Sequence, residues 1–327
     1  MQKKRRILSG MRPTGRLHLG NLVGALENWV QLQKEYDSYY LIADYHALTT
    51  NLDTSGIYNN SLETLIDWLA VGIDPKKSPL FRQSQIKEHA ELHLILSMLI
   101  TTSRLERNPT LKEQVRDLNI ENIAYGHLGY PVLQSADILL YKGELVPVGE
   151  DQVPHVEITR EIARRFNQQY GQVFPEPEPK LTKFSRLPGT DGNMKMSKSA
   201  GNTILLSDSP EIIEQKMKKA VTDPQKIRKG DPGRPEICLV FTYHQKFNNT
   251  ETNQIEKDCR SGALGCVECK KRIAKRLSEH LEPIRNKRTY YESNPDEVIE
   301  ILEDGERRAR AVARVTMEEV RKVMKLG

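Results

Sequence analysis

Residues 10–21 of the chain read GMRPTGRLHLGN, and they join a short apolar segment to an amphipathic one. Residues 6–9 before them fit a short strand. From Leu22 onward, apolar residues recur at spacings of three and four, which predicts a helix. A Pro-Thr-Gly turn therefore leads from a strand into the first turn of a helix. Backbone N–H groups at a helix start lack intrahelical partners and the helix dipole is positive there, so this stretch predicts a phosphate-binding turn.

The residue types within the turn fit that prediction. Gly15 and Gly20 let the backbone approach a ligand, while His18 and Asn21 supply side-chain donors for a charged α-phosphate transition state. The spacing of the two glycines resembles a P-loop. However, Asn21 and Leu22 stand where a P-loop requires Lys followed by Ser or Thr, so the P-loop interpretation fails.

Short apolar runs and longer amphipathic stretches alternate on both sides of this turn. The apolar run 39–43 ends at Asp44, as a buried parallel strand would, and residues 80–81 and 145–148 fit further strands. Residues 62–69 and 90–100 fit helices between them. This alternation predicts an α/β fold with a Rossmann-like, doubly wound parallel sheet, whose ligands bind at the carboxyl ends of the strands.

Beyond the alternating part, the segment 174–180 (FPEPEPK) fits a stiff, extended linker, because each proline fixes φ and disfavours helix in the residue before it. From Pro210 onward the pattern is almost wholly helical. We therefore expect a catalytic domain over residues 1–186, a mobile loop over 187–203 and a smaller all-helical domain over 204–291. Residues 292–327 are expected to return and pack on the first domain.

The loop carries a second phosphate motif, residues 195–199, which read KMSKS. Lys195 and Lys198, bracketed by Met196, Ser197 and Ser199, form a movable clamp suited to β- and γ-phosphates. Such a clamp can bind leaving pyrophosphate more tightly in the transition state than in the ground state. A solvated basic loop is the simpler interpretation of any Lys-x-x-Lys, but the pairing with the first motif favours the clamp.

Composition limits the class of protein. The chain has 327 residues, of which 38% are hydrophobic and 28% charged, with a net charge of +5, a globular profile rather than a disordered one. The basic start is followed by too short an apolar stretch for a secretory signal, and no run is long enough to cross a membrane. We expect a cytoplasmic protein with no membrane partner.

Four cysteines remain: Cys238, Cys259, Cys266 and Cys269, with the spacing C-x20-C-x6-C-x2-C. Four thiolates suit either tetrahedral Zn²⁺ or a [4Fe–4S] cluster, and unrelated buried cysteines are a third interpretation. Base rates favour zinc. Basic residues gather nearby, at 216–219, 226–229 and 270–276, where a solvated face and contacts with nucleic-acid phosphates are equally plausible interpretations.

The two phosphate motifs together resemble the "HIGH" and "KMSKS" signatures of the class I aminoacyl-tRNA synthetases, here residues 18–21 and 195–199. Residues 13–15 (PTG), 136–141 (ADILLY), 146–152 (VPVGEDQ), 71–75 (VGIDP), 158–161 (ITRE) and 220–223 (AVTD) are similar to the tryptophanyl-tRNA synthetases in particular. The likeness runs from about residue 7 to the chain end. The resemblance implies activation of L-tryptophan by ATP and Mg²⁺, transfer to tRNA(Trp), and a homodimer.

The resemblance also implies roles for individual residues. The residues expected to bind ATP are Arg12, Pro13, Thr14, Gly20, Asn21, Gly149, Glu150, Asp151, Leu187, Lys195, Met196, Ser197, Lys198 and Ser199. The expected catalytic residues are His18, Asn21, Lys112, Lys195 and Lys198. Two positions depart from the family: Arg12 stands where Gln is frequent, and Gln134 stands where Met is frequent.

For tryptophan, the resemblance assigns Asp137, with Tyr130 and Gln152 holding the amino and carboxylate ends. An indole has one N–H donor and no acceptor, so a pocket specific for it needs one fixed acceptor. A tyrosine hydroxyl would also suit an acceptor, so Asp137 alone does not separate the two amino acids.

The cysteine spacing is similar to that of a bacterial subset of these synthetases with a [4Fe–4S] cluster in the helical domain, which the resemblance assigns to anticodon recognition. Three other functions compete with this prediction: a tyrosyl-tRNA synthetase-like enzyme, a nucleotidyltransferase that does not act on tRNA, and a non-catalytic nucleic-acid-binding module. The last would need neither phosphate motif.

Overall fold

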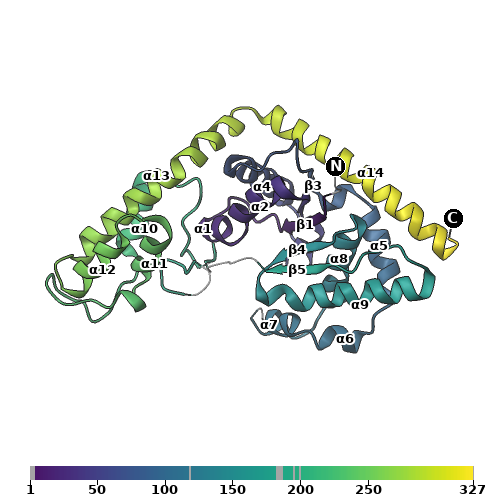
Figure 1. Cartoon of the computed structure of the whole chain (residues 1–327), viewed down its shortest axis with the longest axis horizontal. Helices are drawn as coiled ribbons and strands as arrows, with labels where there is room; N and C mark the ends of the chain where they lie inside the picture. Colours follow the sequence, from purple (N-terminus) through teal and green to yellow (C-terminus); the bar gives the residue numbers. More distant parts are fainter. Residues whose placement is uncertain (1–3, 118, 182–186, 194–195, 199, 327) are drawn as a thin grey trace.

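Five parallel strands form one sheet in the order β3-β2-β1-β4-β5 (Figure 1). The computed structural model describes residues 4–117, 119–181, 187–193, 196–198 and 200–326. Chain order runs outward from β1 to β3 and then returns to β4 on the other side of β1, so the sheet reverses between β1 and β4. The predicted Rossmann-like sheet is confirmed. The strands are β1 (Arg6–Met11), β2 (Asp37–Ile42), β3 (Leu80–Arg82), β4 (Leu145–Val148) and β5 (Glu178–Leu181).

The central strand, β1, has no room for a side chain at one position next to β2. β1 and β2 pair over six residues, and a Cβ added at Gly10 would lie only 2.6 Å from the carbonyl oxygen of Leu41. Glycine is therefore required there. In β2, residues 38–42 are all buried, as the continuous apolar run predicted.

Helices cover both faces of the sheet and connect its strands (Figure 1). The first begins at the predicted position and includes one π-helical turn, η1, between two α-helical parts. Trp29 on its second part stacks on Tyr40 of β2 with ring centroids 4.7 Å apart. The elements are α1 (Leu19–Asn21), η1 (Leu22–Leu26), α2 (Glu27–Glu35), α3 (Asp44–Leu48), α4 (Ile57–Val71), η2 (Gln83–Gln85), α5 (Glu88–Ser97), α6 (Thr102–Glu106), α7 (Pro109–Asp117), α8 (Tyr125–Leu140), η3 (Glu150–Gln152) and α9 (Val153–Tyr170).

The predicted linker over 174–180 is in part a strand, which is a correction. β5 begins at Glu178 and pairs with β4 in register, with Pro179 opposite Val146. Proline lacks an N–H donor, and it is tolerated here because β5 is an edge strand with a neighbour on only one side. This proline-containing segment therefore forms the edge of the sheet rather than a linker.

The C-terminal part is helical and shares one apolar core with the first part. Trp29, Trp68, Val240 and Leu277 belong to the same cluster of buried side chains. None of the helices among the described residues has the length and apolar character needed to cross a bilayer. The elements are α10 (Pro210–Lys219), η4 (Pro235–Ile237), α11 (Leu239–Phe247), α12 (Thr252–Arg260), α13 (Cys266–Glu292) and α14 (Pro295–Met324).

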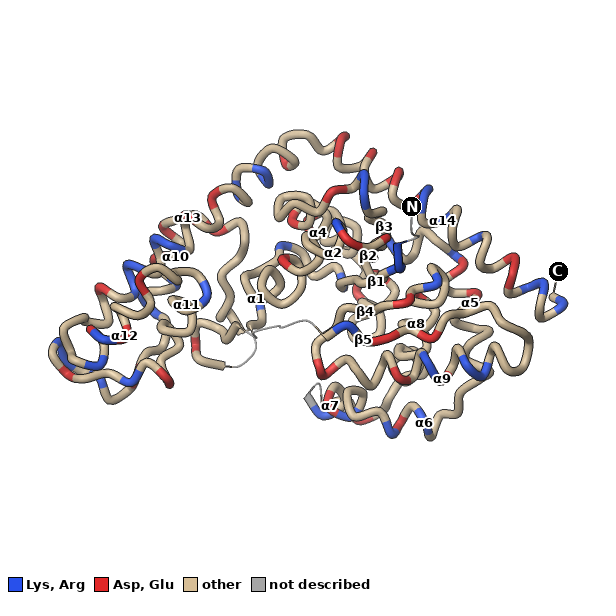
Figure 2. Tube along the Cα trace, in the orientation of Figure 1, with Lys and Arg blue, Asp and Glu red and all other residues tan. Residues whose placement is uncertain are grey.

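The last two helices connect the parts, and both carry Lys and Arg interspersed with Asp and Glu along their length (Figure 2). α13 packs on α4 and α10, and α14 runs back across β3 and α5 (Figure 1). At Gly305 the backbone of α14 meets β3 directly, because an added Cβ would lie 2.0 Å from the carbonyl oxygen of Leu80. The β3 edge of the sheet is thus covered by a helix.

Candidate active site

A pocket of about 370 Å³ opens at the carboxyl ends of β1 and β4, where the strand order reverses. Ligands of doubly wound sheets bind at such a reversal point. β1 contributes Ser9, Gly10 and Met11, and β4 contributes residues 146–148. The predicted residues that line the pocket are Arg12, Tyr130, Gln134, Asp137, Gly149 and Gln152.

The His18 turn lies beside this pocket and is fixed by local contacts. Gly15 has a φ of 79°, a left-handed conformation that side chains rarely adopt. The His18 N–H donates to Asn21 Oδ1 at 3.1 Å, which closes the first helical turn. A Cβ at Gly20 would lie 2.9 Å from the His18 ring, so glycine leaves room for the imidazole.

Backbone pairing joins this turn to the chain that follows the lysine loop. Leu19 N–H donates to Ile204 O, and Leu206 N–H donates to Leu17 O, both at 2.9 Å. Within the loop, the Lys198 ammonium donates to Thr14 O at 2.5 Å. The structure thus brings His18 and Lys198 together, although 180 positions separate them in the sequence.

Electrostatics at this junction keep the imidazole neutral. Burial, followed by the nearby Lys198 charge, lowers the pKa of His18 to about 4. His18 Nδ1 is buried and has no hydrogen-bond partner among the described residues. At neutral pH the side chain is therefore a neutral imidazole with a free ring nitrogen, suited to hydrogen bonding with a phosphate oxygen.

The other predicted ATP residues occupy different environments. Pro13 and Leu187 are buried, whereas Thr14, Glu150 and Asp151 are exposed near the pocket. Met196 is buried, and its sulfur would lie 3.4 Å from a Cβ at Gly20. Ser197 N–H donates to Asn202 Oδ1 at 2.8 Å. The predictions for Lys195 and Ser199 lie outside the described residues.

Lys112 is the predicted catalytic residue that stands apart. It is exposed on α7, and Gln114 of the same helix lines the pocket in its place. Thr110 Oγ1 at the start of α7 donates to Asp151 O at 2.9 Å. The contact holds α7 against the turn that follows β4. It does not bring the Lys112 side chain into the pocket.

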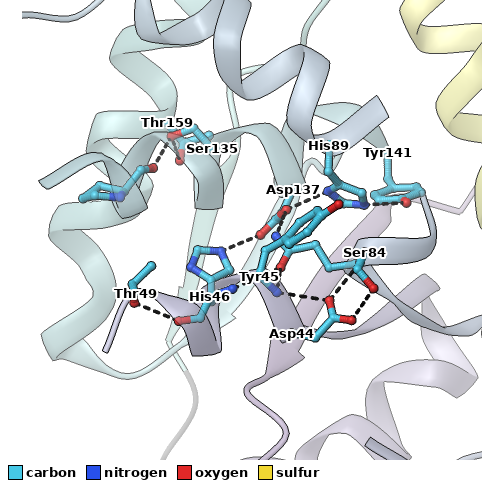
Figure 3. Close-up of polar contacts among 12 residues, drawn as sticks. Asp44, Tyr45, His46, Thr49, Ser84, His89, Ser135, Asp137, Tyr141 and Thr159 are labelled. Carbon is cyan, nitrogen blue, oxygen red and sulfur yellow. Dashed lines mark hydrogen bonds and ion pairs between the residues drawn. The ribbon is translucent and has the colours of Figure 1, made fainter. Parts of the chain in front are cut away.

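Asp137 is fully buried in the pocket floor and accepts three hydrogen bonds (Figure 3). His46 Nε2 lies 2.8 Å from Oδ2, while His89 Nδ1 and Gln83 Nε2 each lie 2.7 Å from Oδ1. Burial would raise the pKa of Asp137, but the hydrogen bonds from His46 and His89 outweigh it and hold the pKa below its ordinary value. The group is a carboxylate.

His46, Gln83 and His89 were not among the predicted site residues. Their positions in the sequence gave only a weak indication: His46 and Gln83 follow the carboxyl ends of β2 and β3, which are neighbours in the sheet. Their convergence on Asp137 depends on the tertiary fold. His89 Nε2 also lies 3.0 Å from the Tyr141 hydroxyl, which orients its ring.

Tyr130, another predicted tryptophan-binding residue, is hydrogen-bonded to a buried histidine. Its hydroxyl shares a hydrogen bond of 2.7 Å with His155 Nε2 of α9. Gln152, half-buried at the pocket edge, donates from Nε2 to Asp151 Oδ2 at 3.0 Å. The structure therefore places Tyr130, Gln152 and Asp137 around the same pocket.

The four cysteines also converge. All are free thiols, and together with Lys226 and Asp223 they line one small cavity of about 20 Å³. Burial, then the neighbouring thiols, raises the pKa of Cys269 to about 12. Across the described residues, no three His, Cys, Asp or Glu side chains are grouped closely enough to hold a single metal ion.

Comparison with known proteins assigns the chain to a family. The model of the class I tRNA synthetases (W and Y) matches residues 1–282. The chain belongs to this family. It is similar to the tryptophan--tRNA ligase of Thermotoga maritima, at 51% identity over 98% of this chain and 99% of that protein. The Aquifex aeolicus tryptophan--tRNA ligase is 47% identical, over 98% of this chain and 100% of that protein.

A solved structure extends the family likeness to the whole fold. The tryptophanyl-tRNA synthetase of Campylobacter jejuni, complexed with ADP and tryptophan, superposes with a TM-score of 0.88 and 34% identity. The match covers 98% of this chain and 100% of that one. An archaeal tyrosyl-tRNA synthetase at 23% identity and a TM-score of 0.68 shares the fold.

The buried His155 makes a pH-dependent contribution to stability that can be measured. Burial first, and then the nearby His46, lowers its pKa to about 4, so the unfolded chain takes up a proton that the folded chain excludes. The stabilisation is present above the unfolded pKa near 6.5 and is lost as the pH falls toward 4. We expect His155 to remove about 2 kcal/mol from the free energy of unfolding between pH 7 and pH 5.

Denaturant unfolding across this pH range checks the expectation. His155→Gln should flatten the pH slope by that amount. Tyr130→Phe is the matched control, because it removes the hydroxyl partner but keeps the imidazole buried, and it should leave the slope unchanged. An identical slope in His155→Gln and the wild type would contradict the assignment.

Proposed function

We propose that the chain joins L-tryptophan to AMP using ATP and then transfers the tryptophanyl group to tRNA(Trp). One observation carries the proposal: His18 and Lys198, from two distant motifs, meet beside a pocket whose floor holds the buried carboxylate of Asp137. Full-length similarity to tryptophan--tRNA ligases supports it. The protein would be a ligase with two phosphate-binding motifs acting on one nucleotide.

The first step forms a mixed anhydride. A carboxylate oxygen of tryptophan attacks the α-phosphorus of ATP, and the bond from that phosphorus to the bridging oxygen breaks, so pyrophosphate leaves with the bonding electrons. Neutral His18 can donate a hydrogen bond to the α-phosphate oxygens, and Lys198 can follow the charge that develops on pyrophosphate. Catalysis is then positioning and charge stabilisation, with no covalent intermediate on the protein. Bound Mg²⁺ would neutralise phosphate charge.

Asp137 is suited to recognising tryptophan by accepting a hydrogen bond from the indole N–H. Its Oδ1 already accepts from two donors, His89 and Gln83, whereas Oδ2 accepts from His46 alone among the residues that the structure describes. A carboxylate oxygen has room for a second donor, so Oδ2 can accept the indole N–H. An amino acid without a donor at this point leaves a buried charge less well paired, which costs about 1–3 kcal/mol.

Arg12, Pro13, Thr14, Asn21 and residues 149–151 would bind the nucleotide, together with Leu187 and the described part of the lysine loop. Tyr130 and Gln152 would hold the amino acid's charged ends. The exposed position of Lys112 requires a shift of α7 for it to reach a phosphate. The helical segment 204–291 would face the anticodon, and a homodimer would carry the tRNA across both subunits.

We also propose a [4Fe–4S] cluster at Cys238, Cys259, Cys266 and Cys269. The fit rests on four free thiols lining one cavity. A single Zn²⁺ at a Zn–S distance of about 2.3 Å would draw its sulfurs to within about 3.8 Å of one another, whereas a cubane cluster spreads them further apart. The choice of the cluster over zinc rests on the resemblance of the cysteine spacing C-x20-C-x6-C-x2-C to that of the cluster-containing synthetases. When bound, the cluster would crosslink the junction of η4 and α11, which holds Cys238, to α12 and α13.

Amino-acid-dependent exchange of pyrophosphate into ATP tests the adenylation step. We expect tryptophan, and not tyrosine or any other standard amino acid, to drive exchange. His18→Ala and Lys198→Met should each lower kcat by about 100- to 1,000-fold, because each removes a donor to developing charge. The exposed Lys219→Met on α10 is the control and should exchange like the wild type. Exchange driven by tyrosine would refute the pocket assignment.

Metal content tests the cluster. Protein purified without oxygen should be brown and carry about four iron and four sulfide per chain. Cys266→Ser should lose the colour, because a ligand is removed, while Val267→Ser, at the exposed neighbour, should keep it. One zinc per chain without iron would contradict the cluster and favour the alternative metal.

A further inference from the structure

A buried arginine of the C-terminal part is paired with acidic residues of the sheet domain. Arg288, on α13, is 2% exposed, and its partner Asp67 on α4 is fully buried. The guanidinium donates from Nη1 to Asp67 Oδ1 and from Nη2 to Glu63 Oε2. Its Nε lies 3.1 Å from Glu292 Oε1. Each nitrogen of the guanidinium thus lies within ion-pair distance of a carboxylate, although the Nε–H makes no hydrogen bond among the described residues.

The second oxygen of Asp67 does not face α13. It accepts the Leu17 N–H at 2.6 Å, and Leu17 directly precedes His18. The neighbouring Arg16 pairs with Glu63 at 3.2 Å and with Glu292 at 3.3 Å. One buried carboxylate therefore bridges a side chain of the C-terminal part and the main chain that carries the catalytic histidine.

The bridge also affects the lysine loop. Burial lowers the pKa of Lys198, and the charges of Asp67 and Glu63 partly oppose this shift. Burial raises the pKa of Asp67 to about 6, against the opposing effects of Arg288 and the Leu17 N–H. Removing the guanidinium would raise this pKa further. The charged groups facing Asp67 are Arg288 and Glu292 of α13, Glu63 of α4, and Arg16 and Lys198 of the two loops.

We propose that Arg288 is a positioning residue for adenylation, which holds Leu17 and His18 in place through the carboxylate of Asp67. The inference rests on the proposed function, since it concerns the same ATP site. The Arg288–Asp67 ion pair is not what attaches α13 to the rest of the protein, because α13 also packs on α4 and α10 through apolar side chains. What the ion pair adds is a fixed main-chain position beside the reacting phosphate.

Steady-state exchange kinetics over pH 6 to 8.5 test this role, with folding followed by circular dichroism. Arg288→Gln should lower kcat/KM for ATP about 10- to 100-fold and leave the KM for tryptophan within about twofold, because only the phosphate side is displaced. Its activity should fall as the pH drops toward neutral, whereas the wild type loses activity only near pH 6. Arg288→Lys should keep part of the activity.

Two further variants separate positioning from simple stabilisation. Asp67→Asn combined with Arg288→Gln leaves no unpaired buried charge, and the amide oxygen can still accept the Leu17 N–H. This double variant should regain about tenfold in kcat/KM for ATP over Arg288→Gln and lose the pH dependence. Arg285→Gln, one turn away on α13 and bonded to Asp208 O and to Ser278, is the control and should match the wild type.

The outcomes distinguish the inference from the proposed function. Tryptophan-dependent exchange in the wild type, unchanged in kcat/KM for ATP and in pH profile by Arg288→Gln, would overturn the inference alone. The inference would also be overturned if Arg288→Gln lost kcat/KM equally for ATP and for tryptophan, in proportion to the loss of folded protein. Absence of exchange in the wild type would overturn the proposed function. If Arg288→Gln fails to fold, Arg288→Lys and the double variant carry the same comparison.

Discussion

The backbone pairing between residues 17–19 and residues 204–206 is the contact on which the site depends. It fastens the chain that leaves the lysine loop to the turn that carries His18, with Leu19 bonded to Ile204 and Leu206 to Leu17. Lys198, six residues before Ile204, donates to Thr14 O from the loop that this pairing anchors at its C-terminal side. Without this pairing, the two phosphate motifs would be separate features of two distant segments.

Burial then sets the charge state of each group around the pocket. His18 is neutral because its surroundings disfavour an imidazolium, and Asp137 stays ionised because neighbouring histidines donate to it. The same low-dielectric setting strengthens hydrogen bonds to a ligand and makes an unpaired group costly. Selectivity and catalysis thus follow from where side chains are buried rather than from unusual chemistry.

The sequence predicted the elements whose signals are local. Strand, turn and helix at residues 6–35 follow from apolar spacing and a Pro-Thr-Gly turn, and the parallel sheet follows from the alternation of short and long segments. Residues that act through tertiary contacts escaped it. His46, His89 and Gln83 meet only at Asp137, and Asp67 and Arg288 meet only where α13 crosses α4. β5 was hidden by prolines, because an edge strand tolerates residues that a central strand excludes.

The central claim is that the His18 turn and the lysine loop bind the same triphosphate. Hydrogen–deuterium exchange with and without a non-hydrolysable ATP analogue tests it. We predict that the nucleotide slows exchange in both segments together, residues 12–22 and residues 196–206, with the Leu19 and Leu206 amides among the protected positions. Protection confined to one segment, with the other unaffected at saturating nucleotide, would contradict the claim that both motifs hold the same triphosphate.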